Sequence, residues 1–384
     1  MNIKKALVFI VFLSLLTATS SVQAAGTDSR YFVKSGSQFW KKSFQVRHAF
    51  DSGFTADLTD WQVKLAKVFN VEITPVRKLN ILAPKKTKPP VKIPLNQVGW
   101  GVRAIYGDDL DSSLPSGGQG VKVAILDTGV LATHPDLKDR IVGCNDLSGE
   151  EPMLKNSCDD KNGHGSQVAG VVAADGGPEG KGIYGVAPES ELMIYKVCAN
   201  DGTCFSDDVA IAIRQAADDG ASIILLSIGS DSQNQIITDA ISYASEKGAM
   251  IIGAVGNDGP YSGSIDYPAA LETVISVGAM DQSFEVPEWS ARGKATNSSE
   301  SKKEGDLEFV APGVNIESTS NNNDYLTISG TSVAAAHIAG LAAKEWQAES
   351  EKPLQSTRDL LHKRSIDIGA VGFNISSGWG MPQL

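Results

Sequence analysis

The sequence predicts an α/β protein built on a mostly parallel central sheet, and two observations carry that prediction. Apolar runs of four to six residues recur from residue 121 onward, as is typical of strands buried on both faces. Amphipathic helical segments separate these runs, and such alternation produces a parallel sheet with helices on both sides. The predicted strands are residues 121–126, 192–197, 223–228, 250–255 and 274–277.

The N-terminus has the composition of a secretion signal. Lys4 and Lys5 precede an apolar run over residues 6–16, and a stretch of small residues ends at Ala24. We therefore expect a cleaved signal peptide over 1–24 and a secreted protein, extracellular or, in a bacterium, periplasmic. An uncleaved anchor is the alternative, but the apolar run is short for a membrane span. We expect no membrane attachment once the signal is removed.

Residues 25–92 form the next predicted domain, which is small and of the α+β type. A strand is expected over 31–34, a short amphipathic helix over 60–69 and further strand over 71–82. A basic, proline-rich linker follows over 85–90, because proline continues neither a helix nor a central strand.

The main domain is expected over residues 93–384, and its charge is opposite to that of the leader. Residues 1–95 carry 15 Lys/Arg and 5 Asp/Glu, whereas the remaining residues carry 19 and 40. An acidic domain offers no basic surface to phosphates, so we expect no nucleic-acid partner. Either the basic leader and the acidic domain attract each other, or the acidic surface serves only solubility.

Two helices are predicted between the strands of the main domain. Ser206 is expected to cap the first, whose apolar positions share one face until Gly220 ends it. Residues 235–247 repeat the arrangement and end at Gly248. The working residues of such sheets gather at the carboxyl ends of the strands, so the functional site is expected there.

The chain has four cysteines, all in the main domain: Cys144, Cys158, Cys198 and Cys204. Three pairings are possible, and we expect the two local ones, 144 with 158 and 198 with 204, in an oxidising compartment. Zinc binding is the alternative, but the C-x2-C spacing of a typical zinc site is absent.

One glycine pattern suggests nucleotide binding but lacks its context. Residues 180–185 fit G-x-G-x-x-G, yet they precede a predicted strand instead of opening a helix. The same stretch fails as a phosphate loop, because Asp175 replaces the first glycine and Gly182 replaces the Ser or Thr after the lysine. A nucleotide-binding enzyme is therefore disfavoured.

Four other segments carry residues with a common chemistry. Asp127 ends a buried strand, His164 lies between glycines at the start of an apolar helix, and Ser332 lies at the start of another helix. Asn257 follows the predicted strand over 250–255. Each segment alone is more often structural than catalytic, but the order Asp, His, Asn, Ser is far less expected by chance.

Together these groups suit nucleophilic catalysis. A serine hydroxyl needs a base, a histidine serves near neutral pH, and a carboxylate fixes the histidine tautomer. An amide and the N–H groups at a helix N-terminus stabilise a developing oxyanion.

The four segments resemble the signature regions of the subtilisin-like serine proteases, the subtilases. The family's serine motif, G-T-S-x-A-x-P-H, is matched at Gly330, Thr331, Ser332, Ala334 and His337. Its histidine motif, H-G-T-H-x-A-G, is matched at His164, Gly165, Ala169 and Gly170. Ser166, Gln167 and Ala336 depart from the motifs, but no triad member is replaced.

The resemblance covers residues 97–384, and residues 30–82 resemble the family's inhibitory prosegment. It implies a subtilisin-like three-layer fold and a monomeric endopeptidase that hydrolyses peptide and protein substrates through an acyl-enzyme. The triad would be Asp127, His164 and Ser332, with Asn257 in the oxyanion hole and no cofactor for catalysis. The precursor would process itself and keep its prosegment as an intramolecular inhibitor.

The resemblance also implies where an extended substrate binds. Ser227, Ile228 and Gly229 resemble one substrate-binding strand, and Gly202 and Thr203 resemble the opposing one. Pairing with a strand edge accepts many side chains, because main-chain hydrogen bonds ignore side-chain identity.

Two details of this site remain hypotheses. A Cys198–Cys204 disulfide would stiffen the wall that carries the opposing substrate strand. Asp258 either favours a basic side chain next to the cleaved bond or is a solvated loop carboxylate.

Calcium is common in this family, and Asp136 matches a segment that often supplies one ligand. The partner loop over 174–182 lacks the usual asparagine pair, and calcium needs six or more oxygens. The resemblance therefore implies a possible structural calcium ion, of which Asp136 is the one ligand that can be named.

Two other functions remain open within the same family. One is a subtilase-like binding protein that has lost activity, and the other is a processing protease of narrow specificity. The family usually continues into a closing helix, whereas this sequence ends at residues 378–384, as a short member or a truncated sequence would.

Overall fold

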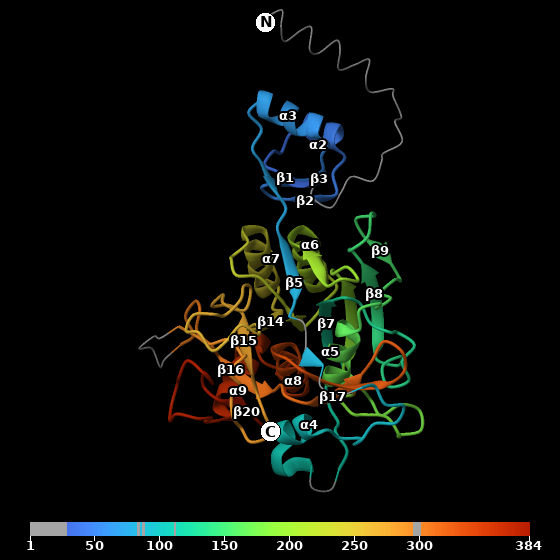
Figure 1. Ribbon diagram of the computed structural model, residues 1–384, viewed down its shortest axis with the longest axis vertical. Helices are drawn as coiled ribbons and strands as arrows, with labels where there is room; N and C mark the ends of the chain where they lie inside the picture. Colours follow the sequence, from blue (N-terminus) through green and yellow to red (C-terminus); the bar gives the residue numbers. More distant parts are fainter. Residues whose placement is uncertain (1–28, 83–84, 87–88, 111–112, 295–300) are drawn as a thin grey trace, which may run out of the picture. The chain divides into compact units, whose positions relative to one another are not determined.

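The computed structural model describes residues 29–82, 85–86, 89–110, 113–294 and 301–384. The predicted signal peptide lies outside these residues, as do parts of the predicted linker. The chain divides into two compact units, Met1–Val76 and Arg77–Leu384, which are described separately (Figure 1).

The first unit is a four-stranded antiparallel sheet with two helices on one face, as expected of an α+β domain (Figure 1). Helix α3 begins where the sequence predicts, because Thr59 and Gln62 form a reciprocal capping box. Phe44, Phe54 and Leu65 lie in the core between the helices and the sheet. In chain order the elements are β1 Arg30–Val33, α2 Gln38–Phe44, β2 His48–Phe50, β3 Gly53–Asp57, α3 Asp60–Val68 and β4 Ile73–Pro75, and the strand order is β2-β3-β1-β4.

The second unit contains the predicted parallel sheet, which has eight strands in the order β16-β15-β14-β12-β7-β10-β8-β9. Every neighbouring pair is parallel except β8 and β9 at one edge. The strands are β7 Lys122–Asp127, β8 Ile141–Asp146, β9 Leu154–Lys155, β10 Glu191–Lys196, β12 Ile223–Leu226, β14 Met250–Ala254, β15 Ile275–Met280 and β16 Phe309–Pro312.

Helices cover both faces of this sheet, as predicted. The connections from β10 to β12 and from β12 to β14 contain α6 and α7, which pack against each other on one face. Helix α5 lies between β9 and β10 in the chain and packs instead against α8 on the other face. Helix α8 packs against α5 and against five strands of the sheet, β7, β12, β14, β15 and β16. The helices are α4 Trp100–Tyr106, η1 Gly107–Leu110, α5 His164–Ala173, α6 Ser206–Asp218, α7 Gln235–Glu246, α8 Thr331–Lys344 and α9 Pro353–Lys363.

The start of α6 corrects one prediction. Ser206 is the first residue of the helix, and Phe205 occupies the N-cap position without a side-chain hydrogen bond. Phe205 ends strand β11, so the backbone enters the helix directly from that strand, and no capping turn precedes it.

Three small sheets complete the second unit. Strand β5 lies between β11 and β13, and β18 lies between β17 and β6, all antiparallel. These strands are β5 Lys78–Ile81, β6 Lys85–Lys86, β11 Thr203–Phe205, β13 Ile228–Gly229, β17 Ile316–Thr319 and β18 Tyr325–Ser329, with β19 Ser365–Ile366 and β20 Met381–Pro382 forming the third.

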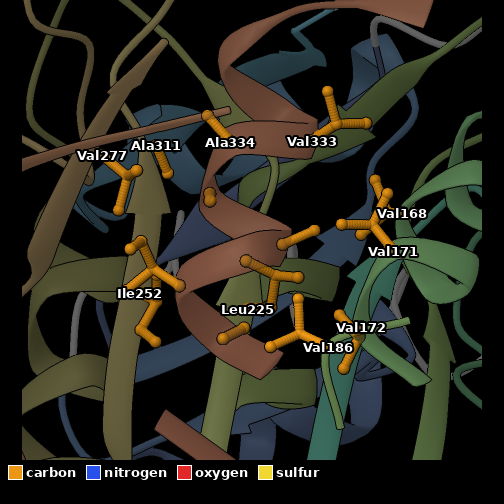
Figure 2. Packing of buried hydrophobic residues seen from close by; sticks show 14 of the residues in the cluster. Val168, Val171, Val172, Val186, Leu225, Ile252, Val277, Ala311, Val333 and Ala334 are labelled. Carbon is orange, nitrogen blue, oxygen red and sulfur yellow. The ribbon is translucent and has the colours of Figure 1, made fainter. Parts of the chain in front are cut away.

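The core of the second unit surrounds α8, which is buried along almost its whole length. Figure 2 shows valines of α5 and apolar side chains of the central strands around this helix. Small residues such as Ala334 and Ala335 let it lie close to the sheet. The helix start that carries Ser332 is therefore rigidly placed.

The two predicted disulfides, Cys144–Cys158 and Cys198–Cys204, are both formed. Within the described part of the chain, no helix combines the length and the apolar character that crossing a membrane requires.

Candidate active site

The site lies at the carboxyl edge of the parallel sheet, where the sequence places it. Asp127 is the last residue of β7, and Asn257 follows β14. His164 begins α5, and Ser332 is the second residue of α8. The helices that carry His164 and Ser332, α5 and α8, pack against each other.

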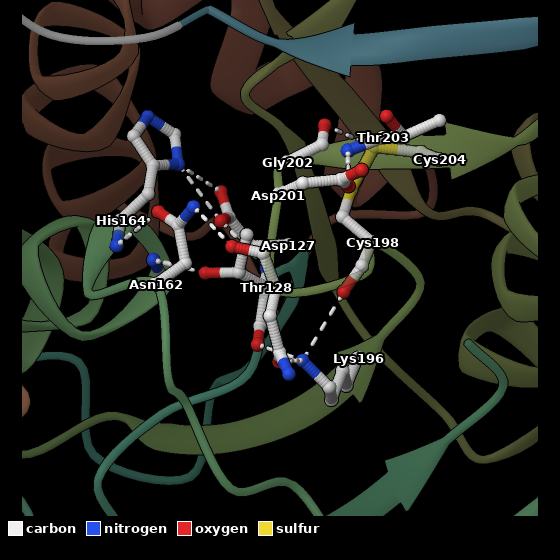
Figure 3. Close-up of a disulfide and its surroundings, with 12 residues drawn as sticks. Asp127, Thr128, Asn162, His164, Lys196, Cys198, Asp201, Gly202, Thr203 and Cys204 are labelled. Carbon is white, nitrogen blue, oxygen red and sulfur yellow. Dashed lines mark hydrogen bonds and ion pairs between the residues drawn. A yellow bond between two sulfur atoms is a disulfide. The ribbon is translucent and has the colours of Figure 1, made fainter. Parts of the chain in front are cut away.

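Asp127 and His164 form a buried pair. Nδ1 of His164 lies 2.8 and 2.9 Å from the two carboxylate oxygens of Asp127 (Figure 3). Burial alone would lower the pKa of His164, but the Asp127 carboxylate outweighs it and raises the pKa above its usual value. Among the described residues, Nε2 of His164 has no hydrogen-bond partner, so this nitrogen is free to accept a proton.

Asp160 holds this pair in place, and the sequence analysis missed it. One of its oxygens accepts hydrogen bonds from the Thr128 hydroxyl at 2.9 Å and from the Gly163 N–H at 2.7 Å. The other accepts from the N–H and hydroxyl of Ser166 at 2.9 and 2.7 Å. The buried carboxylate thus ties the end of β7 to the start of α5. An aspartate just before a helix start is a capping signal that could have found it.

Ser332 and Asn257 converge on one carbonyl oxygen. The Ser332 hydroxyl donates to the Leu82 carbonyl at 2.9 Å, and Nδ2 of Asn257 lies 3.3 Å from the same oxygen. Oδ1 of Asn257 accepts from the N–H and hydroxyl of Thr331 at 3.1 and 3.2 Å. These bonds fix the orientation of the amide, so that its NH₂ group faces the Leu82 carbonyl.

The segment before Leu82 lies between two walls that contain all five residues predicted to bind substrate. Asn80 of β5 is paired with Thr203 on one side and with Gly229 on the other. The Ile81 N–H donates to the Gly202 carbonyl at 2.9 Å, and the Leu82 N–H donates to the Ser227 carbonyl at 3.1 Å. Ile228 is paired with Ile81. This is the geometry of an extended peptide added to strand edges.

The Cys198–Cys204 disulfide connects one of these walls to the Asp127 segment. The Cys198 N–H donates to the Asp127 carbonyl at 3.1 Å, and Cys204 lies in β11 (Figure 3). The buried Lys196 ammonium donates to the carbonyls of Thr128 and Cys198 at 2.6 and 3.1 Å. No local pattern could have identified Lys196, because the partners of a lysine inside an apolar strand come together only after folding.

Asp136 is buried at the other predicted site and has only neutral partners among the described residues. Its carboxylate accepts from the Ile183 N–H at 2.8 Å and from the Tyr325 hydroxyl at 3.0 Å. Gln97, which the sequence analysis did not single out, places its side-chain amide against the Gly180 carbonyl of the neighbouring loop. Among the described residues, this buried carboxylate forms no ion pair.

His337 is a buried packing residue of α8. Its Nδ1 lies 2.8 Å from the Val333 carbonyl one turn earlier in α8. Burial lowers the pKa of His337 to about 4, so the ring is neutral at ordinary pH.

Comparisons with known proteins agree with this arrangement. The model of the subtilase family matches residues 118–380. Subtilisin from Bacillus sp. (strain TA39) is 41% identical over 364 residues, which cover 88% of this chain and 86% of the relative. Subtilisin Savinase from Lederbergia lenta is 38% identical over 274 residues, 71% of this chain and 93% of its own.

Solved structures show the same likeness. S41 psychrophilic protease and sphericase each share 40% identity with the chain, covering 76% of it and 99% of their own length. The TM-scores are 0.72 and 0.73. The subtilisin-like α/β fold expected from the motifs is thus confirmed.

Proposed function

Because the chain belongs to the subtilase family of serine endopeptidases, we propose that Asp127, His164 and Ser332 are its catalytic triad and that it cuts its own precursor. One observation carries the proposal. The carbonyl of Leu82 is held by the Ser332 hydroxyl and the Asn257 amide, while the residues before it pair with strands on both sides. The chain binds its own segment as a substrate would bind.

The geometry supports a division of labour among these residues. Ser332 attacks the carbonyl carbon, and His164 takes the hydroxyl proton on its free Nε2 and later gives it to the leaving amine. Asp127 keeps the other ring nitrogen protonated and stabilises the imidazolium. Asn257 donates to the oxyanion that forms on the former carbonyl oxygen. Water then hydrolyses the acyl-enzyme by the same steps in reverse.

The scissile bond of the precursor is then Leu82–Ala83. The prosegment would run from the end of the signal peptide at residue 24 to Leu82. It would act as an intramolecular inhibitor before cleavage and would remain bound without a covalent link after it. The backbone bonds of Ile81 and Leu82 to Gly202 and Ser227 do not depend on the scissile bond, so they persist in the product complex. We further propose export by the signal, action outside the cell as a monomer and hydrolysis of peptide and protein substrates.

Intact masses test self-processing directly. The wild-type chain and a Ser332→Ala variant are expressed with the signal peptide, and the secreted products are weighed. We expect a mature wild-type product that begins at Ala83 and a variant that retains its prosegment. Trimming of both chains at the same bond would show that another protease matures the protein, and a different wild-type N-terminus would reject Leu82 as the cleavage residue.

We also propose that Asp136 and Gln97 hold a structural calcium ion together with carbonyls of the loop that contains Gly180. A buried carboxylate without an ion-pair partner is costly, and a bound cation would remove that cost. Calcium prefers six to eight oxygen ligands at such loops. When bound, the ion would neutralise Asp136 and fix the loop, and it would take no part in the chemical step.

Chelation is expected to lower thermal stability through this site. At a calcium concentration 100 times Kd, binding stabilises the fold by about 2.7 kcal/mol, so chelator should lower the Tm of the inactive Ser332→Ala protein by about 5–10 °C. Asp136→Asn should remove most of this dependence. Asp139→Asn, at an exposed carboxylate three residues further on, should keep it. Equal Tm values with calcium and with chelator would reject the ion.

A further inference from the structure

The pocket that receives the side chain of Leu82 can be located from the backbone that holds this residue. Leu82 donates its N–H to Ser227 and directs its carbonyl toward Asn257. Gly229 lies two residues after Ser227, and Gly256 directly precedes Asn257. The segments around these two glycines therefore flank the side chain of the residue that precedes the cleaved bond.

The carboxylate of Asp266 fills the space left by these two glycines. A Cβ atom built on Gly256 would lie 2.6 Å from Oδ2 of Asp266, and one built on Gly229 would lie 2.8 Å from the same oxygen. Any side chain at either position would collide with the carboxylate. The oxygen thus lies between the two backbone segments that flank Leu82, at the floor of the pocket.

The backbone fixes this position firmly. The Asp266 N–H donates to the Val255 carbonyl at 2.9 Å, and the next residue, Tyr267, exchanges two backbone hydrogen bonds with Ser230. Asp266 is 5% exposed. No hydrogen bond or ion pair reaches its carboxylate from the described residues, so the carboxylate lacks the partner that a buried acid normally has.

Two charged groups of the described residues act on Asp266, and both are negative. Asp258 and Asp231, both exposed, face it from the loops that follow β14 and β13. Burial, and after it these two carboxylates, raise the pKa of Asp266 to about 7. The group therefore changes from a neutral acid to an anion within the pH range in which a histidine-dependent protease works.

We propose that Asp266 is the specificity-determining residue of this pocket and that it enables the enzyme to accept a basic side chain, lysine or arginine, before the cleaved bond. The proposal rests on the proposed placement of Leu82 as the residue before that bond. Asp258, the candidate for this role from the sequence, lies at the exposed rim, where solvent and salt weaken its effect.

The same residue explains how one pocket can take both apolar and basic side chains. When the carboxyl group of Asp266 is neutral, the pocket tolerates an apolar side chain such as that of Leu82. An ionised carboxylate attracts an incoming ammonium or guanidinium. The attraction is strong because the pair forms in a site away from bulk water, and charges interact more strongly there than in water. Preference for a basic side chain should therefore rise as the pH rises through the pKa of Asp266.

A set of matched peptides tests this directly. The peptides keep the chain's own sequence before the cut, Leu-Asn-Ile-Xaa with a para-nitroanilide leaving group, where Xaa is lysine, norleucine or leucine. Lysine and norleucine have similar length and differ in charge. The ratio of their kcat/KM values cancels the titration of His164, which both substrates share.

For the wild-type enzyme we expect the lysine-to-norleucine ratio to rise about tenfold or more between about pH 5.5 and about pH 8.5. Asp266→Asn should lower the ratio at the higher pH by a similar factor and make it independent of pH. Asp258→Asn should change the ratio less than about threefold, and only at low salt. Cleavage of the leucine peptide, together with titration by a serine-directed inhibitor, shows how much of each variant is folded and active.

Two results would overturn the proposal. One is an Asp266→Asn enzyme whose lysine-to-norleucine ratio follows the wild-type profile. The other needs no variant: a wild-type ratio that stays constant across the pH range and favours norleucine. The proposed function is judged separately, by cleavage of the leucine peptide and by the N-terminus of the mature chain.

Discussion

An Asp127→Asn enzyme is expected to fold normally and to lose about 10⁴-fold in kcat. Both carboxylate oxygens of Asp127 lie within 2.9 Å of His164 Nδ1, and one also accepts the Thr128 N–H at 2.7 Å. Asparagine has nearly the same shape but can offer an N–H to the ring. The His164 tautomer then reverses, and Nε2 carries a proton when it should accept one. Active-site titration followed by peptide kinetics measures the effect.

The pH profile separates this cause from a general loss of structure. Asp127 raises the pKa of His164 against the effect of burial. Without the carboxylate, that pKa falls, so the acidic limb of the residual kcat/KM profile should move to lower pH. Asp159→Asn removes the same charge from an exposed position close by and should leave the rate within about twofold. A variant at Asp127 with wild-type kcat would reject its role.

The motifs were predictable because their signals are local. Glycines on both sides of His164, a helix start at Ser332 and strand ends at Asp127 and Asn257 can all be read within a few residues. The carboxyl edge of a parallel sheet then brings them together. The local cysteine pairs followed for the same reason, since each closes a short loop.

The residues that the sequence did not reveal depend on contacts between distant segments. Asp266 is an ordinary loop aspartate until Gly229 and Gly256 fold around it. Asp160 and Lys196 likewise support the site only through their hydrogen bonds to Thr128, which form when the chain folds. Strand β8 was missed because its pattern is that of a half-exposed strand near a sheet edge.

The boundary between prosegment and main domain likewise depends on contacts between distant segments. Composition favours the basic linker over 85–90 as a dividing point, and the domain limit at residue 92 followed from it. In the structure, the compact unit ends at Val76, and β5 is already part of the second unit. The pairing of β5 with β11 and β13 involves residues more than a hundred positions away, which no local signal encodes.

Glu308→Gln is expected to destabilise the second unit by about 3–5 kcal/mol, because it breaks a buried ion pair. Glu308 is fully buried, and Arg358 binds both of its oxygens at 2.8 and 2.7 Å. Nε2 of His362 lies 2.9 Å from one of them. Glutamine keeps the shape but leaves the guanidinium without its counter-charge. Thermal unfolding in the Ser332→Ala background avoids self-digestion and should show a Tm lower by about 10 °C.

The acid response gives a second, independent measure of the same network. Burial alone would raise the pKa of Glu308, but Arg358 and the hydrogen bond to His362 lower it to about 2. A carboxyl group whose pKa is lower in the folded than in the unfolded state stabilises the fold above its unfolded pKa, near 4.3, and loses that contribution as the pH falls toward 2. The shift corresponds to about 3 kcal/mol, in agreement with the cost of breaking the pair.

Glu308→Gln should therefore be less stable than the parent protein at neutral pH, and it should lose less stability between about pH 4.5 and about pH 2. Glu351→Gln, at an exposed position, should follow the parent protein throughout. A parallel acid response in the parent and the Glu308 variant would show that this carboxylate is not what holds α9 to the sheet at low pH.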